Sequence, residues 1–186
     1  LEIAGVVELR KGRSGGAFIT HGNPQAVSDS MADMLRLGQV SWSDLTEARI
    51  WIEEVIVRVA CERATDADIA ALDANIADAM RHFESGDRRL KTEAMIEFHN
   101  ILARATGNPV LVVMTRTLTD MLRHFAERLS PESTRAVFRS RRRFMSAFAA
   151  RDVETAVKEM EENLIRVHRL YLRIARSREI AAKRRV

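Results

Sequence analysis

The sequence predicts an all-α protein, an antiparallel bundle of six to seven helices preceded by a short β-hairpin. Glycine and proline are sparse, 8 and 3 in 186 residues, and from residue 23 onward they mark the ends of amphipathic segments. Only a few residues connect these segments, which favours antiparallel neighbours. A composition of 46% hydrophobic and 30% charged residues excludes a disordered or collagen-like chain. Charged residues interrupt every apolar stretch, so no membrane span is expected.

The hairpin is expected in a segment that differs from the rest of the chain. Four of the eight glycines lie within the first sixteen residues. Residues 6–9 and 17–19 are strand-like and flank a basic turn at residues 10–16, so residues 3–20 are predicted to form a β-hairpin. An isolated two-stranded hairpin is barely stable in water, and this one therefore needs a packing partner.

The helices are delimited by capping residues at their starts and by glycine or proline near their ends. Ser41 with Asp44, and Thr65 with Asp68, have the spacing of a capping box. Gly107 closes one helix and Pro131 opens another. The expected helices span residues 23–38, 41–63, 65–86, 87–106, 108–129, 130–150 and 152 to beyond 174.

Four helices carry a polar residue on the stripe that should face the core. These residues are Arg49, His99, Arg141 and Asn163. Each has an ordinary explanation when taken singly, since a core histidine is usually satisfied locally and a buried arginine usually pairs with a carboxylate such as Glu53 or Glu97. Four such residues on four helices, however, would converge if the bundle encloses a polar cavity, where ligand sites of helical bundles are found.

The sequence gives little support to other chemistries. No Ser/His/Asp or Cys/His arrangement, phosphate-binding loop or dinucleotide-binding glycine pattern occurs, and no catalytic residue is assigned. The single cysteine, Cys61, cannot form an internal disulfide, so the cytoplasm is the expected compartment. Leu1 is not a start methionine, and an N-terminal truncation is expected.

Taken together, the motifs resemble the GntR transcription regulators of the FadR subfamily, with their helical effector-binding (FCD) domain. The resemblance rests on residues 1–20 (LEIAGVVELRKGRSGGAFIT), Arg49 and Glu53 in an R-x-x-x-E helix, residues 61–65 (CERAT), residues 97–99 (EFH), residues 105–109 (ATGNP) and residues 147–160. It implies that residues 1–20 are the wing remnant of a winged helix-turn-helix DNA-binding domain. Residues 21–186 would then be the FCD domain.

The resemblance also implies partners. Arg10, Lys11 and Arg13 on the wing would contact DNA phosphates, which position a protein without reading much sequence. The recognition helix would precede Leu1, so the chain alone is not expected to bind an operator specifically. A homodimer is expected, because operators of helix-turn-helix proteins usually mirror a two-fold axis.

Many members of this family hold a divalent metal through one aspartate and three histidines. Carried over by position, these ligands fall on Met95, His99, Arg141 and Asn163. Only His99 matches, so neither a metal nor another cofactor is expected. We expect Arg141 to supply the positive charge instead and to bind an acid bidentately, with Arg49 as a second contact and His99 and Asn163 orienting the acid. Met95, at the aspartate position, is the fifth residue assigned to this effector site.

The predicted function is therefore a DNA-binding transcription regulator whose helical domain binds a small acidic effector, an organic acid or an acyl-CoA. Two alternatives stay open on the sequence alone. The first is a helical enzyme that uses His99 as a general base on a small acid. The second is a bundle with a filled core, in which the four inward polar residues pair among themselves.

Overall fold

The computed structural model describes residues 7–10, 12, 16–19, 29–31, 33–34, 37 and 39–183. The elements are β1 (Val7–Arg10), β2 (Gly16–Ile19), α2 (Trp42–Arg63), α3 (Asp66–Glu84), α4 (Arg88–Ala105), α5 (Pro109–Ala126), α6 (Pro131–Ala149) and α7 (Val153–Lys183). The predicted all-α bundle is confirmed. No helix in the described part of the chain is long and apolar enough to cross a membrane.

The two strands pair with each other near the start of the chain. β1 and β2 are antiparallel, with Val7 opposite Ile19 and Arg10 opposite Gly16. The turn residues Lys11 and Arg13 lie outside the described residues. Most of the helix expected at residues 23–38 also lies outside them, and its described residues 29–31 and 33–34 are helical.

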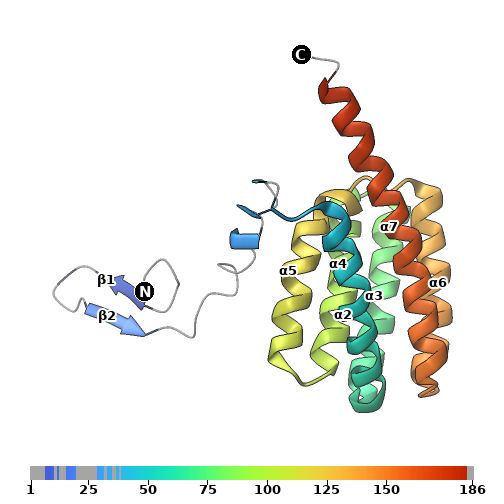
Figure 1. The fold of residues 1–186 in the computed structure, drawn as a ribbon. Coiled ribbons are helices and arrows are strands. Elements are labelled where there is room, and N and C mark those ends of the chain that lie inside the picture. The colour runs from blue at the N-terminus through green and yellow to red at the C-terminus, as the bar shows by residue number, and fades with distance from the viewer. Residues whose placement is uncertain are drawn as a thin grey trace.

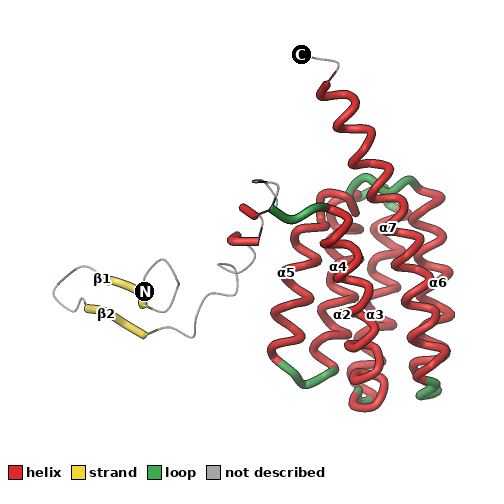
Figure 2. Tube along the Cα trace, viewed as in Figure 1, coloured by secondary structure: helices red, strands yellow, loops and turns green. Residues whose placement is uncertain are grey.

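The six long helices run alongside one another, with the connections gathered at the two ends of the bundle (Figure 2). α4 packs against α2, α3 and α5, while α7 packs against α2 and α6. α7 continues past the end of the bundle toward the C-terminus (Figure 1). Helices α2, α4, α6 and α7, which carry the four inward polar residues, are thus linked through shared neighbours.

Local sequence explains where most helices begin and end. The capping boxes of Ser41 with Asp44 and of Thr65 with Asp68 are both present. These side chains accept hydrogen bonds from the first-turn amides, which have no partner within the helix. Gly86 and Gly107 follow α3 and α4 with φ of 78° and 66°, a left-handed conformation that glycine adopts without steric cost.

The expected end of the fifth helix was wrong by three residues. α5 ends at Ala126, whereas the sequence predicted a helix to residue 129. Leu129 leaves the helical path and buries its side chain, which is 6% exposed. Ser130 must be extended because it precedes a proline, and its ψ of 160° allows it to cap α6. The apolar Leu129 therefore belongs to the α5–α6 loop although its hydrophobicity fits the helical pattern.

A single arginine ties the turn between α6 and α7 to the end of α2. Arg151 has a φ of 58°, unusual for a residue with a side chain. Its guanidinium donates to the carbonyl of Cys61, at 2.6 Å, and to the carbonyl of Ala64. These carbonyls lie at the C-terminal end of α2, where no helical amide can reach them. The contact offsets the strained backbone and fixes α2 against the α6–α7 turn.

The core consists of two hydrophobic clusters. One is built around the fully buried aromatic rings of Phe98, Phe144 and Phe148. The other includes Met95 and Tyr171 and surrounds the cavity described below. The polar residues on the core side of the helices therefore lie in contact with apolar walls.

Candidate functional site

The five residues that the sequence assigned to the effector site line one cavity in the centre of the bundle. They come from four helices: Arg49 from α2, Met95 and His99 from α4, Arg141 from α6 and Asn163 from α7. All are buried, with exposed fractions of 4% to 8%. The predicted inward orientation of the four polar residues is confirmed. Their role in binding an effector stays a prediction.

Arg141 is held by a carbonyl and an aromatic ring. Its Nη2 donates to the backbone carbonyl of Met95 at 2.6 Å, and the guanidinium lies 4.2 Å from the centre of the Phe98 ring. Its Nη1 is buried and has no hydrogen-bond partner among the described residues. Burial, and then the charge of Arg49, lower the pKa of Arg141 to about 9, so the guanidinium remains charged at neutral pH.

Glu53 is the carboxylate of the cluster and is 1% exposed. His99 Nδ1 lies 2.7 Å from its Oε1, and Arg49 Nε lies 3.7 Å from the same oxygen. Burial by itself raises the pKa of Glu53, but His99, Arg49 and Arg141 together bring that pKa below its ordinary value. Glu53 is therefore ionised at neutral pH.

His99 is neutral at neutral pH. Burial lowers its pKa to about 4, and the nearby Glu53 carboxylate only partly opposes this effect. His99 Nδ1 and both Glu53 oxygens are buried, and apart from their 2.7 Å contact no hydrogen-bond partner of these atoms is found within the described residues. Of the two side chains, His99 lines the central cavity.

The cluster carries an excess of one positive charge. Arg49 and Arg141 are cations, Glu53 is an anion and His99 is neutral. An uncompensated buried charge is costly, and a bound anion would neutralise it. The partnerless Arg141 Nη1 provides a donor for that anion.

The cavity itself is small, about 30 Å³. A space of this size holds about two water molecules. Its apolar wall includes Leu129, from the α5–α6 loop, and Tyr171 from α7. An acid with several carbon atoms would fit only after some of these side chains move.

Sequence reasoning missed some members of the site. It treated Glu53 only as a local partner, and it did not include Tyr171, which is buried and faces the cavity. The Arg49-to-Glu53 spacing of one helical turn was an available signal, because a residue four positions from an inward arginine shares its face.

Asn163 already has a hydrogen-bond partner. Its Oδ1 accepts a hydrogen bond from the guanidinium of Arg166 at 2.7 Å.

These side chains do not fit the divalent metal that the resemblance implies for the family. Met95 offers a thioether and Arg141 a cation at two of the four positions, and neither suits a site for a divalent ion. Within the described residues, no group of three or more His, Cys, Asp or Glu is placed to hold a metal. We therefore derive no chemistry through a metal ion.

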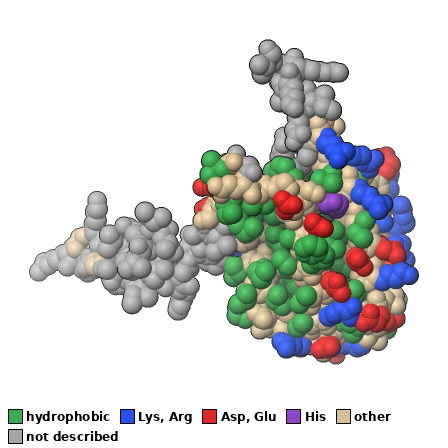
Figure 3. All heavy atoms as spheres, in the orientation of Figure 1, with side chains coloured by type: hydrophobic (Ala, Val, Ile, Leu, Met, Phe, Trp, Pro, Cys, Tyr) green, Lys and Arg blue, Asp and Glu red, His purple; other side chains and the backbone are tan. Residues whose placement is uncertain are grey.

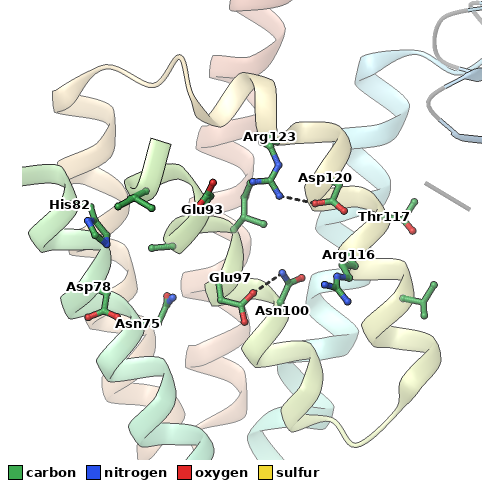
Figure 4. Close-up of a pocket in the computed structure, with 14 residues that line it drawn as sticks. Asn75, Asp78, His82, Glu93, Glu97, Asn100, Arg116, Thr117, Asp120 and Arg123 are labelled. Atoms are coloured by element: carbon green, nitrogen blue, oxygen red, sulfur yellow. Dashed lines mark hydrogen bonds and ion pairs between the residues drawn. The ribbon is translucent and has the colours of Figure 1, made fainter. Parts of the chain in front are cut away.

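A larger hollow of about 810 Å³ opens between α3, α4 and α5 (Figure 4). Several of its charged groups are already paired. Arg123 contacts Asp120 at 2.9 Å, and Glu97 accepts from Asn100 at 3.0 Å and from Arg104 at 2.6 Å. Glu97, one carboxylate considered for the inward arginines, thus faces this outer hollow instead. The central cavity, where a buried charge is unbalanced, is therefore the candidate site.

The chain resembles known proteins. The family model of the FCD domain matches residues 44–166. The chain belongs to the FCD domain family. This FCD domain is 34% identical over 76 residues to the HTH-type transcriptional repressor NanR of Edwardsiella tarda, covering 41% of this chain and 28% of NanR. It is 30% identical over 86 residues to the galactonate operon transcriptional repressor of Escherichia coli, covering 46% and 37%.

A solved structure has the same fold as this FCD domain. It is Streptococcus agalactiae GntR, with a TM-score of 0.71 and 20% identity over 90% of this chain and 76% of that one. The expected resemblance to GntR regulators with an FCD domain is thereby confirmed. The matched part spans about a third of the length of the two curated relatives.

Proposed function

We propose that this FCD domain senses a small acidic effector for a DNA-binding transcription regulator. The effector's carboxylate would bind at Arg141, with Arg49 as a second cation. The observation that carries this proposal is the unbalanced positive charge of the central cluster, together with the free Nη1 of Arg141. A carboxylate at this position would restore neutrality and accept a charge-assisted hydrogen bond.

The size of the cavity favours a small organic acid over an acyl-CoA. A space of about 30 Å³ can grow by side-chain movement around a compact acid. An acyl-CoA would require a channel many times larger, since pockets for drug-sized ligands are typically about 300–1,000 Å³.

The protonation of His99 disfavours the alternative of an enzyme. A general base works best when its pKa is near the operating pH. His99 has a pKa of about 4, so it holds protons weakly. The two curated relatives described above are named as transcriptional repressors, which supports a regulator.

DNA binding would belong to the full-length protein. Residues 1–20 would be the wing remnant, with Arg10, Lys11 and Arg13 against DNA phosphates. Because the matched relatives are named repressors, we propose repression as the mode and the cytoplasm as the compartment. Effector binding would change operator affinity through a coupling of about 1–3 kcal/mol.

A homodimer would present two such DNA-binding heads to a two-fold operator. The support is an exposed apolar face on α2 and α5, which we call the α2–α5 face and define by Trp51, Val55, Val110 and Met114. Their exposed fractions are 61%, 49%, 62% and 40%. Hydrophobic side chains gather over this part of the surface (Figure 3). Exposed apolar patches of this kind commonly mark protein interfaces.

The binding proposal is tested by calorimetric titration with a panel of small carboxylic acids. The panel includes galactonate, the acid that appears in the name of the Escherichia coli relative. We expect saturable binding that weakens at least about tenfold in Arg141→Met, equal to about 1.4 kcal/mol. Arg139→Met, at an exposed position on the same helix, is the matched control and should bind as the wild type does.

Two results would contradict the proposal. Equal affinity in Arg141→Met and the wild type would remove Arg141 from the site. Absence of binding and of any thermal shift with the whole panel would favour the filled core. Arg141→Met leaves the Arg49–Glu53 pair in place, and circular dichroism of the variant establishes that it is folded before binding is compared.

A further inference from the structure

A second pocket lies outside the central cavity, where the end of α3 and the start of α4 meet the α5–α6 loop. It has a volume of about 390 Å³, within the range of small-molecule sites. Lys91, Arg88 and Arg128 line it, together with Ser130 at the start of α6. We call it the Lys91 pocket. It is separate from the effector site proposed above, although Leu129 contributes to the walls of both.

Lys91 is the residue that requires explanation. The residue is only 4% exposed, and it lines the pocket. Burial, and then the positive charge of Arg88, lower the pKa of that ammonium group. Placing a cation in a largely buried position beside a second cation is unfavourable unless an anion compensates the charge.

The other charges around the pocket are predominantly positive. Arg88 donates one hydrogen bond to the carbonyl of Glu127 at 2.8 Å, and Arg128 is exposed at the rim. Two carboxylates oppose these cations. Asp87 caps α4 by accepting from the Leu90 amide at 2.9 Å, and Glu127 partly restores the pKa of Lys91.

The balance is three cations against two carboxylates. One of those carboxylates, Asp87, is already committed to a helix end. The pocket also adjoins the first turn of α6, a helix of 19 residues whose N-terminal end carries partial positive charge.

We propose that the Lys91 pocket binds a phosphate group, as inorganic phosphate or as part of a phosphorylated small molecule. Phosphate carries between one and two negative charges at neutral pH and can accept hydrogen bonds from several separate cations at once, which suits three basic side chains on two elements. Lysine binds phosphate as a compact point charge. The volume of the pocket exceeds that of phosphate alone and leaves space for a small attached group.

The chain is well suited to a direct test, because it has only four lysines against 26 arginines. Protein labelled with carbon-13 lysine therefore gives few side-chain signals by nuclear magnetic resonance. We expect the Lys91 signal to shift saturably on titration with inorganic phosphate at constant ionic strength, and to shift also with glycerol phosphate. The signal of Lys158, exposed on α7, should stay in place.

Variants separate specific binding from general screening. Arg128→Gln should weaken phosphate binding about fivefold, and the Lys91 signal of this variant reports whether the fold is intact. Lys91→Met, measured by calorimetry, should weaken phosphate binding at least about tenfold. Arg89→Gln, on the same helix but paired with Glu93 outside the pocket, should bind within about twofold of the wild type. Arg141→Met should bind phosphate normally, because the two sites are distinct.

The proposal is overturned if the Lys91 signal shifts no more with phosphate than with sodium chloride. It is also overturned if Arg128→Gln, with the Lys91 signal still at its folded position, binds phosphate as tightly as the wild type. A glycerol phosphate affinity equal to that of phosphate would identify the phosphate group as the recognised part. A higher affinity would show that the remaining volume is also used.

Discussion

Arg49, Glu53, His99 and Arg141 form a single electrostatic unit in the interior, and each of them sets the state of the others. The pKa of the Glu53 carboxylate is lowered by His99 and by the two guanidinium groups, and the imidazole is neutral because burial outweighs the carboxylate. Removing one partner from such a buried group is more disruptive than the strength of any one contact suggests. The properties of this site therefore belong to the set of four side chains.

The neutral state of His99 predicts acid destabilisation. Its pKa in the folded chain is about 4, below the unfolded value of 6.5. Between these two values the unfolded chain binds a proton that the folded chain excludes, so the unfolding free energy falls as the pH decreases through this window. We expect His99 alone to contribute a loss of about 2 kcal/mol between about pH 7 and pH 5.

The measurement is urea unfolding of the wild type and of His99→Gln at both pH values. The variant lacks the titrating group, so its unfolding free energy should fall by about 2 kcal/mol less than that of the wild type. Comparing the two slopes cancels the contribution of the titratable groups that do not interact with His99. Parallel pH dependences would show that His99 titrates normally in the folded chain.

Sequence periodicity was sufficient to find the inward polar residues but not the whole of either pocket. Arg49 and Arg141 interrupt stripes of aliphatic residues and are recognisable for that reason. Lys91 was missed because a lysine near the start of a helix is usually exposed, and the pocket it lines is completed by residues of the α5–α6 loop. Contacts of this kind come from segments far apart in the chain, and helical periodicity carries no information about them.

At the scale of the helices, capping chemistry made the starts predictable. Ser41, Thr65 and Ser130 all cap the helices that the sequence assigned to them. The end of α5 was not predictable in the same way, because Leu129 fits a helical stripe and only the loop geometry shows that it has left the helix. Helix starts are set by side-chain hydrogen bonds between residues at most three positions apart, whereas the end of α5 is set by tertiary packing.

The capping box of α2 predicts the effect of a single hydroxyl. Ser41 accepts from the Asp44 amide at 3.1 Å, and the hydrogen bonds that Ser41 donates from its side chain and backbone lower the pKa of Asp44. Ser41→Ala should lower the unfolding free energy by about 1 kcal/mol, measured by urea unfolding. Ser43→Ala, an exposed serine inside the first turn, is the matched control and should change it by less than about 0.5 kcal/mol. Equal effects of the two substitutions would contradict the capping role.

For the whole molecule, the sequence predicted the class of fold and the number of long helices, but not which helices are neighbours. Packing α7 against both α2 and α6 brings Arg49, Arg141 and Asn163 to one cavity. The same packing leaves the α2–α5 face apolar and uncovered in the single chain. That surface is the basis of the prediction about assembly.

The α2–α5 face predicts how the chain assembles. We expect light scattering coupled to gel filtration to give twice the chain mass of 21.1 kDa for the wild type. Trp51→Lys places a charge in the centre of the apolar face and should shift the protein to a monomer. Glu161→Lys, on the exposed side of α7, is the control. It changes the net charge by more than Trp51→Lys does, and this variant should remain dimeric. A monomeric wild type, or a dimeric Trp51→Lys, would contradict this assignment.

Leu129 has a consequence for which molecules the domain can admit. It is the shared partition between the buried arginines and the outer basic pocket, and it comes from a connecting loop. A smaller residue there would join the two spaces into one passage with positive charge at both ends. In the proposed effector site the loop would therefore limit the length of the acid, while the arginines of the helices would select its charge.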